Sequence, residues 1–230
     1  MRGLIDRRIL LNFTADPAEV QRLIPAPFRP KIYRGKAIVG ICLIRLKHIR
    51  PSGLPAFVGV SSENGAHRVA VEWEEGPRVK EGVYVPRRDT SLKINALVGG
   101  RLFPGRHQLA KFTVQEGGGR YHVAFRSRDE TRISLDAQET TNFPPTSIFE
   151  NLANASAFFE GGSIGYSPNG KKFDGLRLAA YTWQVQPLSV SAVESSFFED
   201  EALFSKGSVV FDNALLMKNI EHEWHEVNLK

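Results

Sequence analysis

The segment from Gly100 to Lys111 carries the residues best suited to bind an acidic small molecule. Arg101, Arg106 and His107 follow one another closely within it. A guanidinium can hold a carboxylate through two parallel hydrogen bonds, and an imidazole can exchange protons near neutral pH. The three residues could therefore hold an acidic substrate, with Arg101 as the anchor and His107 as the proton-transfer group. In the alternative interpretation, Arg101 pairs with a structural carboxylate and Arg106 and His107 lie on a solvated turn.

A second candidate pair, Arg68 and Glu72, lies in a segment of alternating polarity. From His67 to Trp73, apolar residues at every second position predict a strand, and Arg68 and Glu72 share its polar face. Inside a closed barrel this face would line a cavity, whereas on an open sheet it would face water. The cavity is slightly favoured, because other polar residues crowd the same stretch.

Metal and nucleophile chemistry find weaker support. Residues 221–226 contain two histidines, but a strand would place them on opposite faces. In a helix His222 and His225 would be three residues apart, whereas an HExxH motif needs four. The serine pairs at 61–62 and 195–196 lie outside any Gly-x-Ser-x-Gly motif, and Cys42 lies in a predicted core strand. No glycine-rich stretch matches a nucleotide-binding motif. We therefore expect neither a metal ion nor another cofactor.

Short strands separated by glycine and proline are predicted to position these residues. Besides 67–73, the predicted strands cover 37–49, a hairpin of 112–115 and 121–126, a segment 176–185 closed by Pro187, and 208–226. Gly40 would mark a bulge in the strand that contains it. Strands without regular helical alternation indicate an α+β fold that is mainly antiparallel β, with a few peripheral helices around a double sheet or a closed barrel.

Three helices are predicted outside the strands. Asp16 precedes Pro17 and Glu19 as a capping aspartate, so a short helix should extend to about residue 23. Ser147 and Glu150 form a second capping pattern ahead of an apolar stripe that ends near residue 159. The third helix is expected between residues 90 and 102, although two glycines weaken that prediction.

Composition limits the class of protein. The chain has 230 residues, of which 42% are hydrophobic, so it can bury a substantial core. No stretch approaches the roughly 20 apolar residues of a membrane span, and the start lacks the features of a signal peptide. Cys42 is the only cysteine, which favours a reducing cytoplasm. The net charge is +5, but pairs such as Arg7–Arg8 and Arg87–Arg88 are scattered. They indicate a solvated, mildly basic surface, and a nucleic-acid partner is the weaker alternative.

Several motifs, taken in order, resemble one known family. They are residues 23–28 (LIPAPF), 35–40 (GKAIVG), 50–55 (RPSGLP), 63–64 with Arg68, 82–84 (GVY), 100–103 (GRLF) and 183–188 (WQVQPL). Together they resemble the bacterial family called domain of unknown function 2071, or YqjF-like, a branch of the acetoacetate decarboxylase-like superfamily. The resemblance covers nearly the whole chain. It implies a single domain over residues 1–230, in which antiparallel strands close into a cone-like barrel around a cavity. It also implies a homo-oligomer.

The resemblance allows the residues of this chain to be compared with those that carry out the decarboxylase chemistry. In acetoacetate decarboxylase a lysine of lowered pKa, beside a second lysine, forms a Schiff base with the keto group. Gly100 and Arg101 match that family's segment, but an ungapped alignment places Gln108 and Leu109 at the two lysine positions. Lys111 lies two or three residues away, and Lys93 lies on the preceding predicted helix. Schiff-base decarboxylation is therefore disfavoured.

These arguments lead to one expectation about function. The protein should act on or bind a small anionic organic metabolite, resembling an oxo-acid, inside a decarboxylase-like barrel and without Schiff-base chemistry. The sequence leaves open whether it is an enzyme, lyase-like or otherwise, or a non-catalytic ligand-binding protein. The candidate catalytic residues are His107 and Arg101, and the candidate substrate-binding residues are Arg68, Glu72, Arg106 and Lys111.

Overall fold

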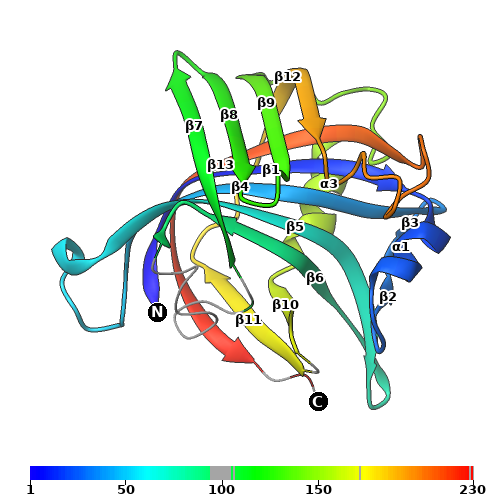
Figure 1. Cartoon of the computed structure of the whole chain (residues 1–230), viewed down its shortest axis with the longest axis horizontal. Coiled ribbons are helices and arrows are strands. Elements are labelled where there is room, and N and C mark those ends of the chain that lie inside the picture. The colour runs from blue at the N-terminus through cyan, green and yellow to red at the C-terminus, as the bar shows by residue number, and fades with distance from the viewer. Residues whose placement is uncertain (94–104, 106, 171, 228, 230) are drawn as a thin grey trace.

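Thirteen strands form one continuous mixed sheet in a computed structural model that describes residues 1–93, 105, 107–170, 172–227 and 229 (Figure 1). The strands are β1 Arg2–Ala15, β2 Arg29–Pro30, β3 Ile32–Tyr33, β4 Lys36–Arg50, β5 Val60–Glu75, β6 Arg78–Thr90, β7 His107–Gly117, β8 Arg120–Ser127, β9 Arg132–Glu139, β10 Ile164–Asn169, β11 Lys172–Ala180, β12 Gln186–Ser195 and β13 Val209–Val227. The helices are α1 Pro17–Leu23, the 3-10 turn η1 Ala56–Val58, and α3 Leu152–Glu160.

The sheet closes on itself. Strands β13, β1, β4, β5 and β6 pair in that order, and β6 continues to β10, β11 and back to β13. A second path runs from β6 through β7, β8, β9 and β12, and it also returns to β13. All of these pairings are antiparallel except β6 with β7 and β6 with β10, which are parallel. The predicted mainly antiparallel, closed barrel is therefore confirmed.

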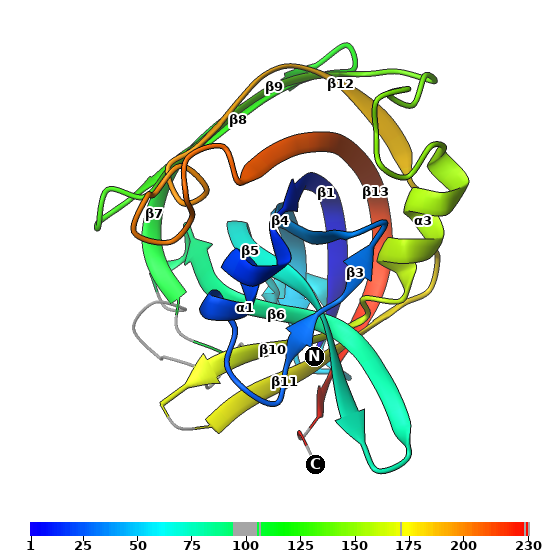
Figure 2. The same ribbon diagram turned by 90° about the vertical axis from the view of Figure 1, so that its right-hand side faces the viewer.

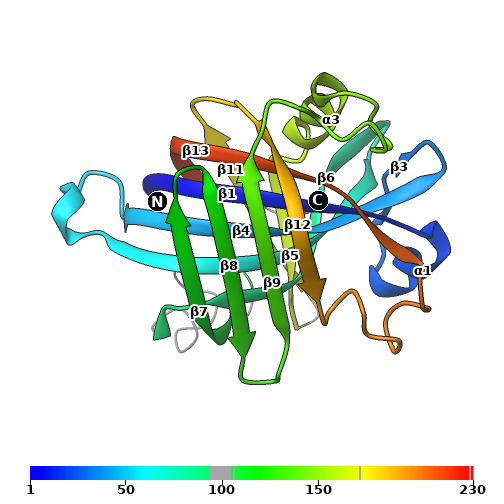
Figure 3. The same cartoon turned by 90° about the horizontal axis from the view of Figure 1, so that it is seen from above.

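Strands β13, β1, β4, β5 and β6 belong to both closed paths and are called the shared strands. They carry apolar side chains on both faces. Strands β8, β9 and β12 arch over them and cross them at a steep angle, and β10 and β11 lie on the opposite side (Figures 2 and 3). One core packs between the shared strands and the arch, with Leu11 and Leu135 fully buried. The other packs beneath the shared strands, where Leu10 and Leu215 meet Phe159 of α3. Because successive residues of a strand face opposite ways, Leu10 and Leu11 belong to different cores.

Several local predictions can be compared with these elements. The strand over 67–73, the 112–126 hairpin and the terminal strand over 208–226 are confirmed within β5, β7–β8 and β13. The first helix is confirmed as well, because the Asp16 carboxylate accepts hydrogen bonds from the backbone N–H groups of Ala18 at 2.8 Å and Glu19 at 3.3 Å. The third predicted helix lies almost entirely outside the described residues.

Three details of the prediction were wrong. The second helix begins at Leu152, capped by Asn151, because the Ser147 hydroxyl donates to Asp212 of β13 and holds its own segment in a turn. Pro187 lies inside β12 and does not close the preceding strand. Gly40 causes no bulge, since it pairs in register with its neighbours on both sides. It allows close packing instead, because a Cβ there would lie 2.3 Å from the Leu11 carbonyl oxygen.

Candidate functional site

A central cavity lies beneath the shared strands, inside the ring that β10 and β11 complete. Its volume, measured as the space open to the centre of a water-sized atom, is about 110 Å³. One part of its lining is apolar and comes from β1, β4, β5, β11 and β13: Ile5, Ile44, Leu46, Ala66, Leu176, Leu178 and Trp224. The other part is polar and comes from β1, β5, β6 and β7: Arg8, Asn64, Arg88, Asp89 and His107. The cavity is therefore apolar on one side and cationic on the other.

Arg88 supplies a cation to this polar wall from β6. Its Nε donates to the Ser167 hydroxyl of β10 at 3.0 Å, which anchors the guanidinium against the neighbouring strand. Burial lowers the pKa of Arg88 to about 10, while Cys42 and Asp174 act in the opposite direction. Arg88 therefore stays protonated at neutral pH, in surroundings that favour an additional negative charge.

Asp89 lines the cavity beside Arg88, but its carboxylate is already engaged. It accepts hydrogen bonds from Arg87 at 2.7 and 2.9 Å and from the Ser127 hydroxyl at 2.5 Å. Burial raises the pKa of Asp89 against the opposing effects of Arg87 and Ser127. Its charge is compensated mainly by Arg87, which also binds Asp129. Asp89 therefore does not serve as the main counter-ion of Arg88.

His107 begins β7 and pairs in parallel register with Arg88. Its Nδ1 lies 3.3 Å from the Gly105 carbonyl oxygen. Because that oxygen can only accept, the contact requires the proton on Nδ1, so Nε2 carries the ring's lone pair. Burial, and next the nearby Arg88, lower the pKa of His107 to about 4. The imidazole is therefore neutral at physiological pH.

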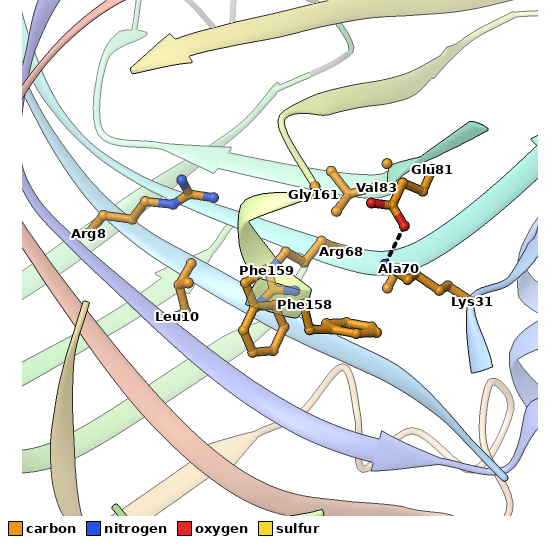
Figure 4. A pocket seen from close by; sticks show the side chains of 12 residues that line it. Arg8, Leu10, Lys31, Arg68, Ala70, Glu81, Val83, Phe158, Phe159 and Gly161 are labelled. Carbon is orange, nitrogen blue, oxygen red and sulfur yellow. Dashed lines mark hydrogen bonds and ion pairs between the residues drawn. The ribbon is translucent and has the colours of Figure 1, made fainter. Parts of the chain in front are cut away.

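A smaller inner cavity adjoins the central one, and Arg8 lines both. By the same measure, its volume is about 20 Å³. Figure 4 shows Arg8 and Arg68 near it, with Phe158 and Phe159 of α3 below and Lys31 bound to Glu81 at the far side. Arg68 is only 4% exposed, and its guanidinium lies 4.9 Å from the centre of the Phe159 ring.

A chain of amides holds Arg68 in place. Arg68 donates to Asn12, Asn12 donates to Asn213 at 2.8 Å, and Asn213 donates to Asp212 at 2.6 Å. Both asparagines are fully buried. The negative charge of Asp212 thus stabilises the orientation of Asn213 and, through Asn12, the position of the arginine.

Cys42 lies near the guanidiniums of Arg8 and Arg68, and its Sγ is 3.7 Å from an Nη atom of Arg8. The residue is 3% exposed. Burial alone would raise the pKa of the Cys42 thiol, but Arg8 and Arg68 outweigh that effect and the pKa is lowered. The cysteine therefore belongs to the same cationic region of the interior.

The residues predicted from the sequence lie in different places. His107 lines the central cavity and Arg68 lines the inner one. Glu72 lies 3.5 Å from Arg29 on β2, and neither cavity includes it in its lining. Lys111 is exposed on β7, and Lys93, which follows β6, is exposed as well. Arg101 and Arg106 lie outside the described residues.

Sequence reasoning missed Arg8 and Arg88, the two arginines among the described residues that line the central cavity. Both belong to arginine pairs that were assigned to a solvated surface. In a strand, however, adjacent residues face opposite ways, so one member of each pair must point toward the interior if the sheet is closed. Arg7 turns to the opposite face of β1, where it is also buried and pairs with Glu63 at 2.6 Å.

The histidine-rich segment lies in β13. His222 is 1% exposed, whereas the side chain of His225 is 56% exposed. No group of three or more potential metal ligands occurs among the described residues. In the same part of the chain, no helix has the length and apolar character needed to cross a membrane.

Solved structures with the same architecture are acetoacetate decarboxylases and related enzymes. Acetoacetate decarboxylase from Legionella pneumophila matches with a TM-score of 0.65 and 11% identity over 100% of this chain and 86% of that one. An acetoacetate decarboxylase-like enzyme from Sphingomonas wittichii RW1 matches with a TM-score of 0.64 and 11% identity over 100% and 92%. The enduracididine biosynthesis enzyme MppR, complexed with pyruvate, matches with a TM-score of 0.57 and 12% identity over 96% and 87%.

These similarities define the class of fold: the protein has an acetoacetate decarboxylase-like barrel. The chain belongs to the DUF2071 family of uncharacterized conserved proteins, whose family model matches residues 5–213. Among curated protein sequences, none matches this chain. The resemblance noted from the ordered motifs is confirmed both for the family and for the superfamily fold.

Proposed function

We propose that the barrel binds a small organic acid in its central cavity. The observation that carries this proposal is the two-sided lining, with Arg8 and Arg88 on one wall and aliphatic side chains on another. A carboxylate can bind a guanidinium through two hydrogen bonds. A short carbon chain attached to it would then lie against Leu176 and Leu178 of β11, where burial of apolar surface adds affinity.

The charges of the lining support an anionic ligand. Among the described lining residues Asp89 is the only carboxylate, and Arg87 and Ser127 already engage it. A buried cation without a dedicated counter-ion is costly, and a bound acid would compensate it. The known complex of MppR with pyruvate supports the same class of ligand, since that enzyme shares the fold and pyruvate is a small oxo-acid.

Schiff-base chemistry does not form part of this proposal. The described residues that line the central cavity include no lysine. Lys111 is exposed, and its partner on the neighbouring strand β8 is Arg126. A carbonyl substrate in the cavity would therefore meet guanidiniums, which can polarise it without forming a covalent bond.

Calorimetric titration with butyrate and its neutral isostere butyramide tests the proposal. The two compounds share a carbon chain, so they make the same contacts with the apolar side chains of the cavity. Only butyrate can form an ion pair with the arginines. We expect butyrate or 2-oxobutyrate to bind at least about ten-fold more tightly than butyramide, because the charged hydrogen bonds add roughly 1.4 kcal/mol or more. Equal affinity for the acid and the amide would refute an arginine-anchored acid site.

A second candidate function is proton transfer on a bound oxo-acid, and the position of His107 in the cavity beside Arg88 supports it. The neutral imidazole could take a proton from the carbon next to the keto group through Nε2, and Arg88 would stabilise the enolate that forms. Returning the proton restores the substrate, so in heavy water the reaction exchanges hydrogen for deuterium.

Proton nuclear magnetic resonance of pyruvate in heavy water distinguishes this enzyme from a pure binding protein. We expect the methyl signal to fade in the presence of the protein, and to fade about 100-fold more slowly with His107→Phe. Binding of pyruvate without any loss of the methyl signal would leave the acid-binding function and exclude the proton transfer.

A further inference from the structure

The inner cavity combines a very small volume with an unusual concentration of positive charge. Arg8 and Arg68 both line it, and the space suits the centre of a single water-sized atom. Arg68 is almost completely buried. The Nε atoms of both arginines are buried and have no hydrogen-bond partner among the described residues.

The nearby acceptors do not balance these two cations. Glu81, the only carboxylate among the described lining residues, is paired with Lys31. Asn12 offers Arg68 a neutral amide oxygen, and Cys42, 3.7 Å from Arg8, could balance at most one of the two cations even as a thiolate. The C-terminal end of α3 adds a partial negative charge, but the Phe159 carbonyl already accepts from Gly161 and Gly162.

The dimensions of the cavity select the kind of ligand. A space of about 20 Å³ for atomic centres accepts a single atom of roughly the size of water, but it is too small for a carboxylate with its attached carbon chain. A monatomic anion meets both conditions, since it needs one position and accepts several N–H groups at once. The Phe159 ring covers one face of the Arg68 guanidinium, so that group donates its hydrogen bonds within its own plane.

We infer that the inner cavity is a halide site, in which a chloride ion binds between the guanidiniums of Arg8 and Arg68. The ion would compensate charge in the interior that the described protein groups leave uncompensated. The halide site also goes beyond the proposed acid site, because of these two cavities Arg68 lines the inner one and Arg88 lines the central one.

Thermal unfolding in sodium chloride and in sodium gluconate, at equal ionic strength, measures the effect of the ion. Gluconate is too large for the cavity, so general screening is the same and only chloride can occupy the site. At ten times its dissociation constant, chloride should raise the melting temperature by about 4 °C over gluconate. Arg68→Met should abolish this difference. Arg126→Met, which removes an exposed arginine paired with Glu130, should retain it.

Crystals soaked in sodium bromide give an independent measurement on the unmodified protein, in case Arg68→Met does not fold. An anomalous peak between Arg8 and Arg68 would support the halide site. A water molecule at that position without anomalous signal, together with equal melting temperatures in the two salts, would overturn it.

The acid site and the halide site can fail separately. Arg88→Met should weaken butyrate binding about 100-fold and keep the chloride-dependent stabilisation, whereas Arg68→Met should keep butyrate binding and lose the chloride effect. Loss of the chloride effect in Arg88→Met and its persistence in Arg68→Met would place the halide in the central cavity and refute the inference.

Discussion

Arg88→Met is expected to weaken the binding of butyrate by about 100-fold, close to 2.7 kcal/mol. Methionine fills a similar volume but removes the guanidinium that faces the central cavity from β6. Arg8 remains as a second cation on the same wall, so binding should be weakened and not abolished. Titration calorimetry of the variant against butyrate measures the change directly.

The same substitution should not destabilise the free protein. Burial lowers the pKa of Arg88, which means that its surroundings disfavour the charge when no ligand is present. We therefore expect the melting temperature of Arg88→Met to equal or exceed that of the unmodified protein. Ser167 loses one donor in the exchange, which is a small cost for a hydroxyl that can reorient.

Arg126→Met is the matched control for this titration. Arg126 lies on β8 outside the cavity and pairs only with Glu130 among the described residues, and both side chains are more than 60% exposed. Its loss should leave the affinity for butyrate unchanged. If both variants weaken binding equally, general electrostatic attraction accounts for the affinity and the cavity site is refuted.

The barrel could be predicted because its strands alternate in polarity and because its ordered motifs identify a family. Val69, Val71 and Trp73 recur at every second position, a period that only a strand satisfies. The closure through β10 and β11 could not be predicted in the same way, since it depends on parallel pairing between residues about eighty positions apart, such as Tyr84 and Tyr166. Local patterns carry no information about such partners.

The candidate site was predicted less completely, because its residues have no characteristic spacing. Arg8, Arg88 and His107 come from three strands that meet only in the closed barrel. His107 and Arg68 attracted attention through their chemistry and their strand position. Arg8 and Arg88 did not, because a pair of arginines in an unknown strand resembles a solvated surface equally well. The ring of strands, which turns Arg8 and Arg88 toward the central cavity, provides the missing information.

The start of α3 shows how tertiary contacts displace a local signal. Ser147 and Glu150 have the spacing of a capping box, yet the Ser147 hydroxyl donates to Asp212 at 2.6 Å and the Ile148 N–H donates to the same carboxylate at 2.8 Å. A charged acceptor on β13 competes with the helix for these donors. The helix therefore starts one turn later, at Leu152.

His67 provides the second prediction, which concerns stability against pH. The residue is fully buried on β5, with its ring centre 4.3 Å from that of Phe197. Neither ring nitrogen has a hydrogen-bond partner among the described residues, although Asp89 lies 3.9 Å from Nδ1. Burial, and then Arg87, lower the pKa of His67 to about 3 from its ordinary value of 6.5.

The sign of the effect follows from the proton balance. Between about pH 6.5 and pH 3 the unfolded chain binds a proton at His67 and the folded chain does not, so acid favours unfolding. The stabilisation is complete above pH 6.5 and is lost progressively as the pH falls toward 3. Over a drop from about pH 7.5 to about pH 4.5, His67 alone should remove roughly 3 kcal/mol from the free energy of unfolding.

Urea unfolding of His67→Phe at these two pH values tests the claim. Phenylalanine keeps an aromatic ring beside Phe197 and cannot be protonated, so the variant should lose about 3 kcal/mol less than the unmodified protein over that interval. Some acid sensitivity must remain, because burial also lowers the pKa values of His107 and His222 to about 4. Replacement of the exposed His225 by glutamine should reproduce the behaviour of the unmodified protein. An acid-induced loss of the same size in His67→Phe would mean that the His67 ring is not excluded from water in the folded barrel.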